Sequence, residues 1–200
     1  MARYTGPAIK QSRREGLALT DKAQKYLDRR PYPPGEHGRG RIRQSEYLLQ
    51  LREKQKTRRF YGMLEKQFRR TYEKANRQPG ITGENLLRML EMRLDNVVYR
   101  LGFAATRRQS RQLVNHGHFR VNGKKVDIPS YQVKPNDVIT VKQGSNAEPI
   151  IRAATELVAS VAPWLQADYD ALNGKILKAP ERSEIDTPVS EQLIVEYYSK

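Results

Sequence analysis

Apolar residues recur at helical spacing from about residue 45 to residue 101. The apolar positions of the first two predicted helices are Tyr47, Leu48, Leu51, Leu64, Phe68 and Tyr72. A third run of leucines and valines lies between residues 82 and 101, and it breaks near Arg93. Such spacing is typical of the packed stripe of a helix. The pattern therefore predicts a mainly helical region over residues 45–92.

After this region the spacing between apolar residues changes from about four residues to two. Phe119 and Val121 face one way on a predicted strand, and Asn122-Gly123 is a strong signal for a two-residue hairpin turn. A capping box at residues 106–109 predicts a helix just before this hairpin. Residues 93–142 therefore predict a module of two helices, a hairpin and a further strand. Together with the preceding helices this makes the fold class α+β.

The first 44 residues show little hydrophobic periodicity. They contain Arg13-Arg14 and Arg29-Arg30, followed by a stretch rich in proline and glycine over residues 31–40. Prolines fix φ and remove hydrogen-bond donors, while glycines allow sharp reversals. We expect an extended, turn-rich basic arm over residues 1–44 that becomes ordered when it binds its partner.

The pattern is weakest in the tail. It offers a helix near residues 151–160, a short strand around residues 175–177, and a final apolar helix that Ser190 can cap. We therefore divide the chain into the arm (1–44), a helical domain (45–92), a second module (93–157) and a C-terminal segment (158–200) that packs back on the helical part.

The distribution of charge says more about the function of the chain than the hydropathy pattern does. The chain has 37 basic and 22 acidic residues, which gives a net charge of +15. Residues 1–90 carry 22 basic against 9 acidic residues, whereas residues 151–200 carry 5 against 8, a net charge of −3. A basic excess of this size indicates an anionic partner, either nucleic acid or a membrane surface. The tail is expected to serve another purpose.

Several classes of function lack the residues they need. The chain has no cysteine, so disulfides and thiolate metal sites are excluded. No secretory signal is visible, and the longest apolar stretch is too short to span a bilayer. No nucleophile elbow or phosphate-binding glycine loop is present. We expect a soluble, cytoplasmic protein that is not an enzyme and needs no metal or cofactor.

A span without acidic residues gives the sharpest local signal. Between Asp95 and Asp127 there are seven basic residues and no Asp or Glu. Arg107 and Arg108 stand in the first turn of a predicted helix, where the helix dipole disfavours cations, and Arg111 is a like-charged neighbour of Arg107 at i+4. A sequence that accepts both penalties indicates an anion at this place, because helix N–H groups and arginine forks together bind phosphate.

Hydrogen-bonding and stacking groups surround this cluster, and this mixture is typical of RNA recognition. Membrane binding remains an alternative, but it would require an apolar helix face that the packing of these helices already uses. The candidate RNA-binding residues are Arg13, Arg14, Tyr32, His37, Arg39, Arg41, Lys54, Lys56, Arg58, Arg59, Arg69, Arg70, Arg93, Arg100, Thr106, Arg107, Arg108, Arg111, Gln112, His116, His118, Lys124, Lys125, Ser130 and Tyr131.

Two sets of motifs resemble a known family. Arg93-Leu94-Asp95, Thr106-Arg107-Arg108, His116-Gly117-His118 and Val121-Asn122-Gly123-Lys124 are similar to the S-four RNA-binding domain. The stretches 32–38, 47–56, 66–70, 82–87 and 193–200 resemble the bacterial small-subunit ribosomal protein S-four family, in its cysteine-free, zinc-independent form. The resemblance covers nearly the full chain.

The resemblance implies a helical N-terminal domain and an S-four domain with two helices packed on a small antiparallel sheet. It implies binding to the five-prime domain of small-subunit ribosomal RNA early in assembly. It also implies contact with ribosomal protein S-five, a place near the site where messenger RNA enters, and a role in translational accuracy. The alternatives are an RNA-modifying enzyme that carries an S-four domain and another, non-ribosomal RNA-binding protein. Arg93-Leu94-Asp95 resembles a pseudouridine synthase motif, but its place in a helical pattern favours an ion pair for Asp95.

Overall fold

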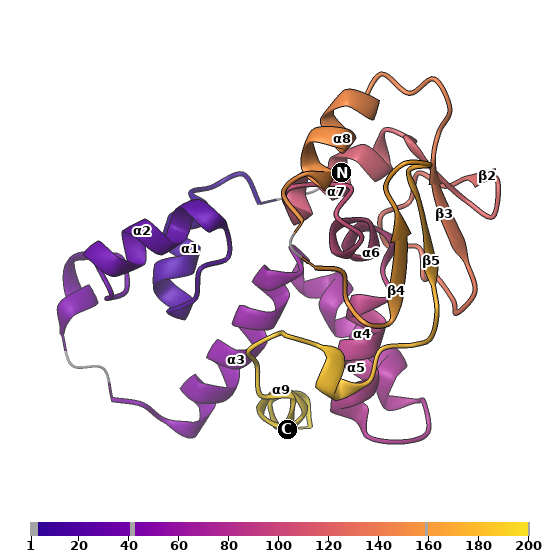
Figure 1. The fold of residues 1–200 in the computed structure, drawn as a ribbon. Helices are drawn as coiled ribbons and strands as arrows, with labels where there is room; N and C mark the ends of the chain where they lie inside the picture. Colours follow the sequence, from indigo (N-terminus) through magenta and orange to yellow (C-terminus); the bar gives the residue numbers. More distant parts are fainter. Residues whose placement is uncertain (1–3, 41–42, 159, 200) are drawn as a thin grey trace. The chain divides into compact units, whose positions relative to one another are not determined.

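The computed structural model describes residues 4–40, 43–158 and 160–199. The chain forms two compact units, each described here by itself. The first unit combines residues 1–83 with residues 187–200, and the second contains residues 84–186. Figure 1 shows the chain coloured along its sequence. Among the described residues, no helix has the length and apolar character needed to cross a bilayer.

The arm is not extended as predicted. It forms two short helices, α1 (Ala8–Glu15) and α2 (Asp21–Arg29), and a short 3-10 helix, η1 (Glu36–Arg39). Gly16 ends α1 in the left-handed conformation, as is common just after a helix. Among the arm residues whose burial the structure describes, Ser12 and Ala23 are fully buried. Because these side chains are small, they leave no hydrophobic period in the sequence, and the helices were missed for that reason.

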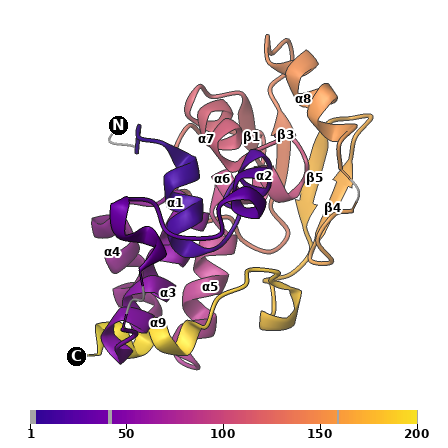
Figure 2. The ribbon, with the colours of Figure 1, turned by 90° about the vertical axis from the view of Figure 1, so that its left-hand side faces the viewer.

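The first unit is built on α3 (Glu46–Phe60) and α4 (Glu65–Asn76), with α9 (Glu191–Tyr198) beside α3 in both ribbon views (Figures 1 and 2). The buried stripe of α3 is polar and consists of Gln50, Lys54 and Thr57. The predicted apolar face, by contrast, leaves Tyr47 56% exposed. The prediction of an apolar buried face for this helix was therefore wrong. The buried face of α3 is polar because polar groups of α9 match it.

Polar, aromatic and apolar contacts join α9 to the rest of the first unit. Gln50 donates to Glu196 at 3.1 Å, and the Lys54 ammonium lies 4.8 Å from the centre of the Tyr197 ring. Ile194 is fully buried. Tyr198 stacks on Tyr72 of α4 at 4.6 Å between ring centroids, so the tail is anchored by aromatic as well as polar contacts.

Tyr198 also donates to Glu65 at 2.8 Å. Burial, reinforced by this bond, raises the pKa of Tyr198 well above its ordinary value. The expected side-chain cap by Ser190 is not formed. The backbone N–H of Ser190 instead donates to Glu53 of α3 at 3.1 Å.

The second unit is centred on an antiparallel sheet of five strands in the order β2-β1-β3-β5-β4. Their bounds are β1 (Phe119–Val121), β2 (Lys124–Lys125), β3 (Val138–Val141), β4 (Leu165–Asp168) and β5 (Asn173–Ile176). The predicted hairpin is confirmed, since Val121 pairs with Lys124. Asn122 and Gly123 both have positive φ, as a tight hairpin turn of this kind requires.

The helices of this unit are α5 (Thr82–Glu91), whose first two residues belong to the first unit, then α6 (Leu94–Arg100), α7 (Arg107–Asn115), α8 (Glu148–Thr155) and the 3-10 helix η2 (Arg182–Glu184). Leu94, Val98, Leu113, Phe119 and Trp164 belong to one hydrophobic cluster, which joins the helices to the sheet. The α+β fold class is therefore confirmed.

The sheet continues past the expected module boundary at residue 157. Strand β5 pairs with β3, and β4 pairs with β5, so residues 165–176 belong to the sheet rather than to a tail on the helical part. A close approach of backbone and side chain requires a glycine here. A Cβ on Gly174 would lie 2.5 Å from a methyl carbon of Leu101. Within the described residues 187–199, α9 packs on the helical unit.

Candidate nucleic-acid interface

The N-terminus of α7 holds the predicted arginine cluster. Thr106 caps the helix by accepting from the Gln109 N–H at 3.2 Å, while the Gln109 side chain accepts from Ala105 rather than from Thr106. Arg107 donates to the Asn96 side chain at 3.0 Å and lies 4.4 Å from the centre of the Tyr99 ring. Arg108 is exposed. The cap thus fixes a helix end at which one arginine is held and its neighbour faces solvent.

Beneath this helix end lies a buried carboxylate. Asp95 accepts two hydrogen bonds from Arg93, at 3.0 and 2.7 Å, and one from Arg111 at 3.4 Å. The Arg93 side chain is only 4% exposed. Arg93 is therefore an interior ion-pair partner, and its predicted place on the RNA surface is corrected. The expected pairing of Asp95 with nearby arginines is confirmed. Burial lowers the pKa of Arg111, and Asp95 opposes this shift.

The loop at residues 129–133 supports the start of α6, the helix that carries Asp95. The Leu94 N–H donates to the Tyr131 carbonyl at 2.9 Å, and the Asp95 N–H donates to the Pro129 carbonyl at 3.1 Å. These bonds satisfy N–H groups at the start of α6, which would otherwise lack partners. The side chains of Ser130 and Tyr131 remain exposed. The loop therefore combines a structural backbone with side chains that are open to a ligand.

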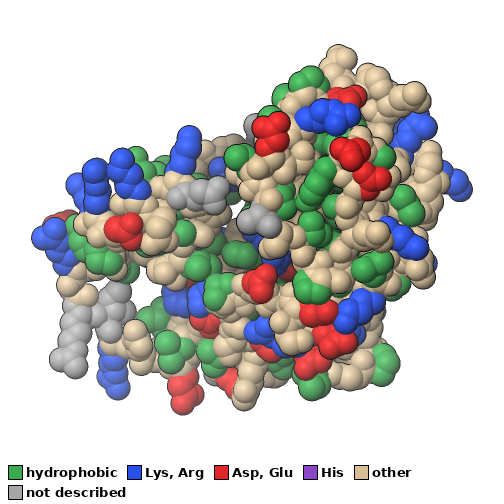
Figure 3. Space-filling model, viewed as in Figure 1, with side chains coloured by type: hydrophobic (Ala, Val, Ile, Leu, Met, Phe, Trp, Pro, Cys, Tyr) green, Lys and Arg blue, Asp and Glu red, His purple; other side chains and the backbone are tan. Residues whose placement is uncertain are grey.

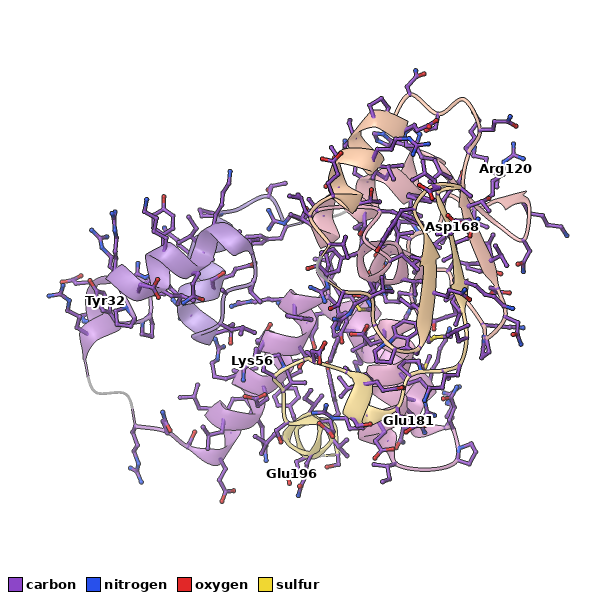
Figure 4. All side chains as sticks on the ribbon, in the orientation of Figure 1. Tyr32, Lys56, Arg120, Asp168, Glu181 and Glu196 are labelled. Carbon is purple, nitrogen blue, oxygen red and sulfur yellow. The ribbon has the colours of Figure 1, made fainter. Side chains whose placement is uncertain are left out.

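The hairpin adds exposed cations. Arg120 stands opposite Lys125 in the register of β1 and β2, and both side chains are exposed, as is Lys124. Figure 4 shows Arg120 pointing outward from the sheet. Lys125 lies 3.6 Å from Asp127, but both side chains are more than half exposed, so this ion pair is weak. Arg120 was missing from the predicted site, although its alternation with the buried Phe119 and Val121 could have revealed it.

His116 and His118 flank Gly117 at the end of α7. His118 Nδ1 lies 2.8 Å from the Ser145 hydroxyl, and the two imidazole centroids are 6.1 Å apart. Burial, followed by the charges of His116 and Lys142, lowers the pKa of His118. His118 is therefore neutral near pH 7, whereas the surface around it is cationic. His116 and Gln112 are exposed.

The arm of the first unit contains a second cationic group. The guanidinium groups of Arg13 and Arg39 lie 4.9 and 4.8 Å from the centre of the Tyr32 ring. Arg39 also donates to the Tyr32 hydroxyl at 3.0 Å, which lowers the pKa of that hydroxyl. Arg13 donates to the carbonyls of Arg30, Tyr32 and Pro33. Arg13 therefore fixes the turn that Tyr32 occupies, which is labelled in Figure 4.

A buried acidic residue also organises α3. The Glu15 side chain is fully buried and pairs with Arg52 at 3.2 Å and with Arg59. Among the described residues, Glu15 Oε2 has no hydrogen-bond partner. Burial raises the pKa of Glu15, and this effect exceeds the opposing influence of Arg59 and Arg52. The network links α1 to α3, and sequence reasoning missed it because the partners are 37 and 44 residues apart.

The other predicted cations of the first unit differ in accessibility. Lys54 is 3% exposed and donates to Glu65 at 2.9 Å, so it too is an interior residue and its predicted RNA contact is corrected. Lys56 pairs with Glu53, and Arg58 lies 3.7 Å from Glu65. Figure 4 shows Lys56 on α3.

The remaining predicted residues lie nearer the surface. In the first unit Arg14, His37, Arg69 and Arg70 are exposed, and in the second Arg100 is half-buried against Glu91. Arg41 lies outside the described residues. Figure 3 shows lysine and arginine side chains gathered over the segment of α1 and α2. Within the parts of the chain that the structure describes, no group of three or more His, Cys, Asp or Glu could hold a metal ion.

A basic helix end, a cationic hairpin and exposed stacking groups on one small α+β module are the features of a nucleic-acid-binding domain. Residues 92–139 match the family described as the S4 domain, and residues 3–91 match the Ribosomal protein S4/S9 N-terminal domain. The small ribosomal subunit protein uS4 of Rubrobacter xylanophilus is 56% identical over 200 residues, which cover 100% of both chains. Those of Nocardia farcinica and a Nocardioides species are 59% and 60% identical over 202 residues, again at full coverage. The chain belongs to the uS4 family of small ribosomal subunit proteins.

This membership confirms the expected family and, with it, the expectation of a ribosomal protein rather than an enzyme. The zinc-independent form rests on the sequence, which has no cysteine.

Proposed function

We propose that the protein binds the five-prime domain of 16S ribosomal RNA early in assembly of the small subunit and contributes to translational accuracy. Family membership supports the ribosomal role. One observation assigns the RNA contact to particular residues. Arg108, Arg120 and Lys124 are exposed, and none of them makes an ion pair with another described residue. Cations without carboxylate partners are free to replace the counterions of a phosphate backbone.

The first unit supplies a second contact of a different kind. In the arm, Tyr32 with its two arginines combines an aromatic surface with positive charge, a combination that suits stacking on unpaired bases as well as contact with phosphates. The arm would be fixed in place by the RNA. Each unit therefore contributes a contact, and binding through both raises the effective affinity above that of either one.

The acidic part of the chain favours a protein neighbour. Residues 151–200 carry a net charge of −3. Asp168, at the edge strand β4, and Glu181 are both exposed (Figure 4). Carboxylates at these places repel phosphate. We propose that this part contacts another small-subunit protein, with S-five as the partner that the family resemblance names, near the site where messenger RNA enters.

Affinity measurements over a range of salt concentrations test the proposal. The full chain is titrated with the folded five-prime domain of 16S ribosomal RNA, with homopolymer RNA and with anionic liposomes. We expect the folded RNA to bind at least 10³-fold more tightly than the homopolymer at physiological salt, by about the margin that separates specific from non-specific nucleic-acid binding. Equal affinity for both RNAs would contradict a specific ribosomal contact, and preference for liposomes would favour a membrane surface.

A further inference from the structure

A small cavity of about 150 Å³ opens between the end of α7 and the loop after β3. It is lined by His116, Gly117, His118, Lys142, Gly144, Ser145 and Asn146. None of these residues is acidic, and three can carry positive charge. The lining combines two imidazoles and one ammonium with a hydroxyl and an amide. We infer that this cavity is a phosphate-binding pocket.

The walls of the pocket are fixed by the fold. The Lys142 N–H donates to the His118 carbonyl at 2.8 Å, which ties the end of β3 to the residue before β1. Ser145 is buried, and its hydroxyl oxygen accepts from the Ala147 N–H at 3.2 Å. The loop is therefore held from both sides. A preformed site binds a ligand without the entropic cost of ordering its own residues.

The hydrogen-bond pattern orients the imidazole. The Ser145 oxygen accepts from the Ala147 N–H, and its own proton is available to His118 Nδ1 at 2.8 Å. In the tautomer in which Ser145 donates to Nδ1, neutral His118 carries its proton on Nε2 and can donate it to an anionic oxygen. Burial lowers the pKa of His118 most, and the charges of His116 and Lys142 add to this; a bound phosphate would oppose the two charges. Phosphate binding should therefore raise the affinity of His118 for a proton.

Backbone donors complete the pocket. Neither Gly144 nor Asn146 donates its backbone N–H to another residue that the structure describes. Gly144 has φ +68°, a conformation that side chains rarely adopt. The Ser145 N–H between Gly144 and Asn146 donates to the Lys142 carbonyl at 3.1 Å, so two separate backbone N–H groups remain for an anion. Together with the Lys142 ammonium and His118 Nε2, they give the pocket more donors than acceptors.

The inference deepens the proposed function, because the phosphate may be offered by the ribosomal RNA backbone or by a free phosphate. The first experiment uses the full chain and inorganic phosphate. The chain contains three histidines, so their ring resonances can be followed separately by NMR as the pH is varied. We expect saturable shifts of His116 and His118 and an upward shift of the His118 pKa on adding phosphate. His37, which lies in η1 of the other unit, reports separately on phosphate that binds at the arm.

The second experiment measures the affinity for the folded ribosomal RNA of Lys142→Gln, with Lys134→Gln as the matched control. Both lysines are exposed and lie in the same unit, but only Lys142 lines the pocket. Loss of one phosphate contact lowers the slope of log affinity against log salt by about one unit. We expect this for Lys142→Gln and no change for Lys134→Gln. A normal far-UV spectrum and urea midpoint show that each variant is folded.

The outcomes separate the inference from the proposed function. Histidine shifts that Lys142→Gln abolishes, together with a reduced salt slope, support a pocket for RNA phosphate. Shifts with an unchanged slope support the pocket but assign it to a free phosphate. Absence of histidine shifts together with an unchanged slope overturns the inference while the wild-type chain still binds RNA. Failure of the wild-type chain to bind the folded RNA overturns the proposed function instead.

Discussion

Each unit buries one carboxylate among arginines, and the two clusters differ in how well the charges are satisfied. In the second unit both oxygens of Asp95 accept hydrogen bonds, and its main partner Arg93 is 4% exposed. In the first unit Glu15 leaves one oxygen without a partner among the described residues, and Arg52 and Arg59 are 30% and 17% exposed. In the Asp95 cluster Arg93 is closed to water while Arg111 is 22% exposed, whereas both arginines of the Glu15 cluster reach water.

The difference indicates two roles for buried charge. An ion pair that is closed on all sides is costly to break, because the charge left behind has no solvent. Removing a carboxylate whose arginines reach water costs less, because water solvates the cations that are left behind. We expect the Asp95 cluster to be part of the permanent structure and the Glu15 cluster to hold α1 against α3 only weakly.

The largest effect is expected for Asp95→Asn. The substitution leaves the buried Arg93 guanidinium without its counter-charge, so the free energy of unfolding should fall by about 3–5 kcal/mol. Urea unfolding measures this change. The matched control is Asp127→Asn, because Asp127 pairs with Lys125 on the surface and should contribute less than about 1 kcal/mol. A similar loss of unfolding free energy in the two variants would show that burial of the ion pair does not determine its contribution to stability.

Ile194→Ala should have the next largest effect. Ile194 is fully buried in α9, and its truncation should lower the free energy of unfolding by about 2–5 kcal/mol. Leu193, on the same helix, is only half-buried, so Leu193→Ala should cost less. The RNA affinity of the folded fraction should stay nearly unchanged in both variants. Normal stability combined with lost RNA binding would place α9 on the RNA surface.

Arg108→Ala tests the exposed arginine at the start of α7 in the second unit. Because Arg108 is exposed, its loss should change the free energy of unfolding by less than about 0.5 kcal/mol. It should lower the salt slope of RNA binding by about one unit. Arg111→Ala is the comparison, since it removes a partner of Asp95 and should reduce stability as well. An unchanged slope for Arg107→Ala, Arg108→Ala and Arg111→Ala would remove this helix end from the interface.

The arm should respond to Arg13→Ala. The side chain of Arg13 donates to three backbone carbonyls, whereas Arg14 donates to one. We expect faster proteolysis near residues 30–34 in Arg13→Ala than in Arg14→Ala, corresponding to a local destabilisation of about 1 kcal/mol. Ribosomal RNA should protect the wild-type arm up to Arg43. Equal cleavage with and without RNA would mean that the arm does not contact it.

Glu15→Gln should change the free energy of unfolding only slightly, by no more than about 1 kcal/mol. Because burial raises the pKa of Glu15 above its ordinary value of 4.5, the folded state favours the protonated carboxyl group. The contribution of this group is therefore fully present below pH 4.5 and is lost as the pH rises through the raised pKa. The neutral amide should remove this dependence. Urea unfolding of both proteins between pH 4 and pH 8 checks the prediction, and a loss near that of Asp95→Asn would contradict it.

Local chemistry made part of the structure predictable. The positive φ values of Asn122 and Gly123 depend on residue type alone, and the Thr106 cap needs only a neighbour three residues away. The polar stripe of α3 could not be predicted in this way, because Gln50 is satisfied by Glu196, which is 146 residues distant. The same distance effect hid the interior role of Lys54. A basic residue in a basic region was interpreted as an RNA contact, although its partners come from other elements.

The polar stripe of α3 also has a consequence for synthesis. The first unit is discontinuous, since residues 187–199 follow the whole of the second unit in the chain. A ribosome that makes this protein completes the sheet and the S4 domain before it makes α9. Until then Gln50 lacks its partner Glu196, Lys54 lacks the Tyr197 ring, and Ile194 is not yet present to exclude water. Translation therefore imposes an order on folding, in which the second unit can close first and the helical unit only when its final segment emerges.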